Sequence, residues 1–145
     1  MWAYPGRGDG GFDDRRLIGA SGWNGMSLIT AFGDLTRDGR SDLVARETST
    51  GKLWLYPGTA SGGLADRILT GRSGWGVMGT FIAVGDYSGD GVNDLATITN
   101  DKYTADGWSS PGHWGWLLSY EGQGNGYVKD HRQVDGDWYR LNGAF

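Results

Sequence analysis

Short runs of β-branched and aromatic residues alternate with Gly, Asp and Pro along the whole chain. Such runs, bounded by turn-forming residues, are the sequence signal of β-strands. Strands are predicted over 29–32, 42–46, 52–56, 67–69, 81–84 and 94–98. No segment shows a sustained helical period of apolar residues flanked by helix caps. The pattern therefore predicts an all-β protein.

The same pattern returns at a constant offset along the chain. Residues 2–6 (WAYPG) match 54–58 (WLYPG), and residues 21–23 (SGW) match 73–75 (SGW). Matching that persists through so many positions without a gap is an internal repeat. Four short strands in each roughly fifty-residue repeat are typical of a β-propeller blade.

The repeat divides the chain into a single array. A partial repeat covers 1–32, a second covers 33–84, and a more diverged third covers 85–145 with an insertion near 100–114. We expect blades of four antiparallel strands, about two complete and the others partial. Because an open array would leave sheet faces and edges unburied, we expect a fragment of a longer propeller chain or closure by self-association.

An Asp/Gly-rich loop joins the first two predicted strands of both repeats. Oxygen-bearing side chains occupy its first, third, fifth and ninth positions, and glycine follows the fifth, where a ligand loop must turn sharply. Calcium accepts six to eight oxygen ligands at flexible angles and is the natural occupant. The competing interpretation is an ordinary hairpin turn with solvated carboxylates. The predicted ligands are Asp34, Thr36, Asp38, Asp42 and the Arg40 carbonyl, then Asp86, Ser88, Asp90, Asp94 and the Val92 carbonyl.

The first loop, the strand LVAR and the segment GKLWLYPG that follows resemble the FG-GAP/VCBS-type repeat. This family occurs in the integrin α-subunit propeller and in many secreted bacterial proteins, and the LWLYPG and SGW elements resemble the variety abundant in exported actinobacterial proteins. The resemblance implies calcium clamped between the first two strands of each blade. Thr36 and Ser88 stand where the family usually has Asp or Asn, so we expect each site to be weakened.

Composition and charge argue against several functional classes. A net charge of -4 offers no basic face to nucleic acid, and no apolar run reaches membrane-spanning length. The absence of Cys removes thiolate metal sites and cysteine nucleophiles. Neither a Gly-x-Ser-x-Gly elbow nor a His-Glu-x-x-His helix is present, so we expect no enzymatic activity.

The tryptophans fall into two groups. Those that recur in register are expected to pack within their blades, because a buried aromatic contributes a large hydrophobic term. Non-repeated aromatics lie in or beside the insertion, where a loop held by a rigid scaffold can bind a glycan or a protein. The alternative is that this loop folds back over a neighbouring blade. The candidate ligand-binding residues are Trp108, His113, Trp114 and Trp116.

The sequence thus favours a non-enzymatic, calcium-stabilised propeller segment that acts as an extracellular binding or adhesion module. Extracellular calcium is plentiful enough to fill sites of modest affinity. Secretion would require a signal segment outside this chain. The alternative function is a carbohydrate-binding module attached to a secreted hydrolase, with a cell-surface glycan as its ligand.

Overall fold

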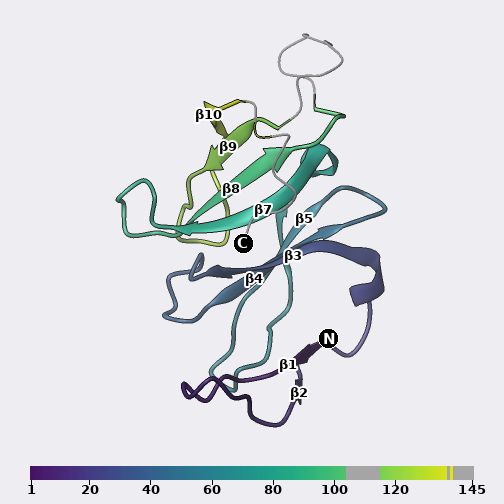
Figure 1. Cartoon of the computed structure of the whole chain (residues 1–145), viewed down its shortest axis with the longest axis vertical. Coiled ribbons are helices and arrows are strands. Elements are labelled where there is room, and N and C mark those ends of the chain that lie inside the picture. Colours follow the sequence, from purple (N-terminus) through teal and green to yellow (C-terminus); the bar gives the residue numbers. More distant parts are fainter. Residues whose placement is uncertain (104–114, 137, 139–145) are drawn as a thin grey trace.

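The structure is a computed structural model that describes residues 1–103, 115–136 and 138 (Figure 1). It contains a short two-stranded sheet and two four-stranded sheets, all antiparallel. The strands are β1 (Trp2–Ala3), β2 (Arg16–Leu17), β3 (Met26–Gly33), β4 (Asp42–Glu47), β5 (Leu53–Tyr56), β6 (Ile68–Gly71), β7 (Met78–Gly85), β8 (Asp94–Thr99), β9 (Leu117–Tyr120) and β10 (Arg132–Asp135).

Each four-stranded sheet is an up-and-down meander in which neighbouring strands follow one another along the chain. We call β3–β6 the first blade, β7–β10 the second blade, and β1–β2 the partial blade. The described residues contain no α-helix, and two 3-10 turns, η1 (Trp23–Gly25) and η2 (Trp75–Val77), precede β3 and β7. The all-β fold class and the four-stranded antiparallel blades predicted from the sequence are confirmed.

The strand register reproduces the sequence repeat. Trp54 pairs with Leu69 across β5 and β6, and Trp2 pairs with Leu17 across β1 and β2. The partial blade is therefore the outer half of a blade. Isolated bridges join Gly6 to Phe12, Gly58 to Leu64 and Gly122 to Val128, so all three copies close the same turn in the same way.

Within the described residues, the hydrophobic core lies between the first and second blades. Because side chains alternate across a strand, one face of each blade points into this core. The first blade contributes Phe32, Leu35, Val44, Leu53 and Leu55, none more than 1% exposed. The second blade contributes Trp75, Met78, Phe81, Val92, Leu95, Leu118 and Tyr120. Each fully buried side chain of this size stabilises the fold by roughly 1.5–3 kcal/mol.

The repeated Ser-Gly-Trp motif forms the 3-10 turn at the start of each complete blade. Gly74 adopts a left-handed conformation with φ 87°, which glycine tolerates best, and Trp75 follows it. The Trp75 ring then stacks on Tyr120 with centroids 4.6 Å apart. In the first blade Trp23 stacks on Tyr56 at 4.7 Å. The expectation that the repeated tryptophans pack within blades fits these two, whereas Trp2 remains 47% exposed.

Candidate metal-binding loops

The two Asp-rich loops lie next to each other, one after β3 and the other after β7 (Figure 1). The Arg37 guanidinium in the first loop donates a hydrogen bond to the backbone carbonyl of Asp90 in the second, at 3.1 Å. The Asn93 amide donates to the carbonyl of Phe32 at 3.2 Å. The loops of adjacent blades are therefore in direct polar contact.

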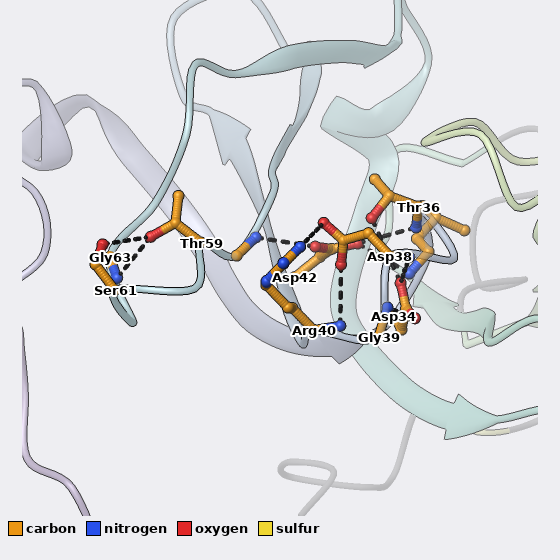
Figure 2. A network of polar contacts seen from close by, with 11 residues as sticks. Asp34, Thr36, Asp38, Gly39, Arg40, Asp42, Thr59, Ser61 and Gly63 are labelled. Atoms are coloured by element: carbon orange, nitrogen blue, oxygen red, sulfur yellow. Dashed lines mark hydrogen bonds and ion pairs between the residues drawn. The ribbon is translucent and has the colours of Figure 1, made fainter.

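In the first loop the chain wraps around the carboxylate at the first position, as Figure 2 shows. Asp34 Oδ1 accepts a hydrogen bond from the amide of Asp38 at 3.1 Å, and its Oδ2 accepts one from Gly39 at 2.7 Å. The Thr36 hydroxyl lies 3.4 Å from Asp34 Oδ1. Asp38 Oδ1 accepts from the amide of Arg40 at 2.9 Å. Three of the predicted ligand side chains thus take part in one local network.

The second loop folds in the same way. Asp86 accepts hydrogen bonds from the amides of Gly89, Asp90 and Gly91 at 2.8–2.9 Å. Asp90 Oδ1 accepts from the amide of Val92 at 2.9 Å, as Asp38 does from Arg40. The two loops therefore share the hydrogen bonds from their fifth- and sixth-position amides to the first-position carboxylate, and the bond from the seventh-position amide to the fifth-position carboxylate.

The aspartate at the ninth position of each loop is buried, with Asp42 2% and Asp94 0% exposed. Asp42 Oδ2 accepts hydrogen bonds from the amides of Leu35 and Thr36 at 2.9 and 3.1 Å. Its Oδ1 accepts from the amide of Gly58, beyond the end of β5, at 3.0 Å. These carboxylates therefore tie the loop to the third strand of the blade.

The second blade repeats this tie. Asp94 accepts hydrogen bonds from the amide of Ser88 at 2.6 Å and from the amide of Gly122 at 2.9 Å. Sequence reasoning assigned Asp42 and Asp94 to a cation and missed their partners beyond the third strand. The available signal was the in-register repetition of Gly58 and Gly122.

The two loops differ in what surrounds the fifth-position carboxylate. In the first loop the Arg40 guanidinium forms an ion pair with Asp38 Oδ2 at 2.9 Å. In the second loop Val92 occupies the position of Arg40, so that this pairing has no counterpart.

Glu121 pairs with Lys129 at 2.7 Å, and this bond raises the pKa of the Lys129 ammonium group. Asp90 and Asp94 raise the same pKa further through their charges.

The loops meet the chemical requirement for a hard cation, since their side chains offer oxygen ligands alone. Asp34 Oδ2 accepts one hydrogen bond, from the amide of Gly39, so it keeps a second lone pair, whereas Oδ1 accepts from both the Asp38 amide and the Thr36 hydroxyl. Among the described residues, however, no three His, Cys, Asp or Glu side chains gather closely enough to hold a metal ion. A cation here would also need the hydroxyl of Thr36 or Ser88 and the backbone carbonyl of Arg40 or Val92.

The predicted ligand-binding aromatics have different outcomes. Trp108, His113 and Trp114 lie outside the described residues. Trp116 is half-buried and packs against the core cluster, and a Cβ added to Gly136 would lie 3.1 Å from its ring. Trp116 is therefore part of the packing of the second blade in this structure.

A pocket of about 420 Å³ lies beside the end of β6, and no pattern in the sequence predicted it. Its lining includes Trp75, Tyr103, Tyr120, Lys129 and His131. The Tyr103 hydroxyl lies 3.4 Å from His131 Nε2, and the rings of His131 and Tyr120 are 5.5 Å apart. Burial raises the pKa of Tyr120 far above its ordinary value, so its phenol stays neutral. The pocket thus combines aromatic faces with hydrogen-bonding groups.

Four-stranded antiparallel blades with an Asp-rich loop between their first two strands define a β-propeller-like repeat module. A family model for the FG-GAP-like repeat matches residues 34–97, from the first loop through most of β8, which is consistent with an FG-GAP-type repeat protein. No curated protein and no solved structure matches the chain. Among the described residues, no helix is both long enough and apolar enough to cross a membrane.

Proposed function

We propose that this chain is a non-enzymatic β-propeller segment that serves as an extracellular binding module and is stabilised by calcium held in its two Asp-rich loops. The observation that carries the proposal is the shared conformation of the loops. In both, the first-position carboxylate collects the amides that follow it while the ninth-position carboxylate anchors the loop to its blade.

The calcium ion would have a structural role. A Gly-rich loop loses considerable conformational entropy when it is ordered, and an ion bound only to the folded state shifts the equilibrium toward folding. The ligands would come from Asp34, Thr36, Asp38 and Asp42, with Asp86, Ser88, Asp90 and Asp94 at the second site. Extracellular modules typically bind calcium at 10⁻⁴–10⁻³ M, and the neutral third ligand favours this weak range.

Thermal unfolding in the presence of calcium and in the presence of a chelator tests the proposal. Calcium at about one hundred times its Kd should stabilise a single-site protein by about 2.7 kcal/mol. Isothermal titration of the chelated protein should give two binding events, and Asp90→Ala should remove one of them. Asp66→Ala, an exposed aspartate outside the loops, is the matched control. Identical unfolding curves with and without calcium, together with no binding heat, would contradict the proposal.

A second candidate function is carbohydrate binding, which the pocket beside β6 supports. Sugars bind to sites that pair an aromatic face with hydrogen-bonding side chains, and Tyr103, Lys129 and His131 supply both here. Glycan-array retention that disappears in His131→Ala but survives in Lys52→Ala, a lysine outside this pocket, would favour this function. Equal retention of both variants would exclude this pocket as the binding site.

A further inference from the structure

The second blade carries an open apolar groove on the face turned away from the first blade. Phe81, Leu95 and Leu118 point into the core, so their strand neighbours point the other way. The groove has a volume of about 270 Å³ and an almost wholly apolar lining. Val84 and Val134 in it are 38% and 41% exposed. The lining includes Val84, Tyr87, Ala96, Leu117, Val134 and Trp138.

The same positions of the first blade form half of the hydrophobic core. Val84, Tyr87, Ala96 and Leu117 occupy the repeat positions of Phe32, Leu35, Val44 and Leu53. Those four side chains are 0–1% exposed because the second blade covers them. The groove therefore has the position and polarity of a surface on which another blade packs.

The partial blade displays the complementary kind of surface. Trp2, Tyr4 and Leu17 are 47%, 56% and 51% exposed, and Trp2 is paired with Leu17 across the two strands. In the second blade the positions of Trp2 and Tyr4 are held by Leu118 and Tyr120, which are 1% and 7% exposed because they pack against the first blade. One chain thus exposes both halves of the interface that it buries between its own blades.

A repeated aromatic pair specifies how the two surfaces fit together. Tyr56 stacks on Trp23, and Tyr120 stacks on Trp75, at centroid distances of 4.7 and 4.6 Å. Tyr4 of the partial blade occupies the repeat position of Tyr56 and Tyr120. Trp138 occupies the repeat position of Trp23 and Trp75, and it lines the groove.

We propose that copies of this chain associate head to tail, with the partial blade of one copy covering the groove on the second blade of another. Tyr4 of the first copy stacks on Trp138 of the second. Such a contact is heterologous, because each copy uses a different surface, and it builds rings or open chains of copies. The partial blade is held in place for this role by Arg16, which donates to the carbonyls of Ser61 and Gly62 at 2.9 and 2.8 Å.

Analytical ultracentrifugation of the full chain over a concentration series tests the proposal. The wild type should self-associate. Tyr4→Asp and Val134→Asp should each weaken association about thirtyfold or more, the loss expected when a central interface side chain is removed. Both residues are exposed in the single copy, so the variants should fold, and circular dichroism checks this. Tyr127→Asp, at a residue 44% exposed in a loop outside both surfaces, is the matched control.

Mixing the two deficient variants makes the test specific. Tyr4→Asp keeps an intact groove, and Val134→Asp keeps an intact partial blade, so together they should form a one-to-one dimer that neither forms alone. Because the natural chain has no Cys, a Tyr4→Cys copy and a Trp138→Cys copy should also form a disulfide when mixed under oxidising conditions.

A wild type that stays monomeric at every concentration would overturn the proposal. Mixed variants that remain monomeric while the wild type associates would also overturn it, because a different surface would then be responsible. Neither outcome depends on calcium, so the cation-binding proposal is tested separately.

Discussion

The buried carboxylate of Asp42 receives the backbone amide of Gly58 at 3.0 Å, and the same bond joins Asp94 to Gly122 at 2.9 Å. The glycine is required by the close approach of the chains. A Cβ added to Gly58 would collide with the backbone carbonyl oxygen of Ser41, and one added to Gly122 would collide with that of Asn93. The aspartate and the glycine are therefore one structural unit, and the blade needs both.

The first prediction concerns these glycines. Gly58→Ala should destabilise the protein by about 1–3 kcal/mol, the usual cost of forcing an extra methyl group into packed structure. Gly6 holds the same repeat position in the partial blade, and a Cβ there would meet no described atom within 4 Å. Gly6→Ala is therefore the matched control and should change stability little. Urea unfolding measures both variants, and equal losses would contradict the structural reason.

The second prediction separates the two kinds of loop aspartate. Asp42→Ala leaves three buried or half-buried amides without their acceptor and should cost at least about 3 kcal/mol of unfolding free energy. Asp38→Ala removes one exposed hydrogen bond from a backbone amide and one exposed ion pair. In the presence of a chelator it should lower the unfolding free energy by about 1 kcal/mol or less. Chemical denaturation without calcium gives both values. A milder effect for Asp42→Ala than for Asp38→Ala would refute the tie between loop and third strand.

The third prediction concerns the difference between the loops. Arg40 forms an ion pair with Asp38, whereas the apolar Val92 at the same loop position offers no charge to Asp90. If the loops bind calcium, the second loop should bind it more tightly, and Arg40→Val should strengthen binding at the first. Calcium titration of Asp90→Ala and Asp38→Ala isolates each site in turn. Thr36→Asp adds a charged oxygen ligand and should raise the affinity of the first loop further.

The fourth prediction is a pH effect. The indole of Trp138 donates a hydrogen bond to Asp135 at 3.0 Å, and this bond, with one from the amide of Gly136, lowers the pKa of Asp135 below 3.8. A lowered folded-state pKa means that the stabilisation is present above the ordinary carboxyl pKa and is lost as the pH falls through the folded value. The Nε1–H resonance of Trp138 should therefore shift with a midpoint below 3.8. In Asp135→Asn this acid shift should vanish, and a midpoint above 3.8 would show that the bond does not form.

Local patterning was sufficient to predict the strands β3–β8. The segments around Phe32 and Val44 read as strands because apolar residues stand between turn-forming residues, and β3 and β4 extend those predictions by a few positions at their ends. The repeat also predicted the four-stranded blades, since a matched segment must fold in a matched way. Residues whose roles depend on their immediate neighbours could thus be interpreted from the sequence.

Roles that depend on distant partners could not be predicted in this way. The pairing of Asp42 with Gly58 requires the third strand to return beside the first loop, and no local pattern encodes that contact. Leu35 is buried and its repeat counterpart Tyr87 is exposed, because a neighbouring blade covers Leu35 and none covers Tyr87 among the described residues. Whether the loops hold calcium stays a prediction, because identical carboxylates serve as amide acceptors or as cation ligands.

The guanidinium of Arg37 reaches from its own loop to the backbone carbonyl of Asp90 in the adjacent one. Anything that rigidifies the second loop therefore also restricts a side chain rooted in the first. In a longer array built from such repeats, each loop would restrict the motion of the loop before it. A loop ordered at one end of the array would therefore reduce the mobility of successive loops.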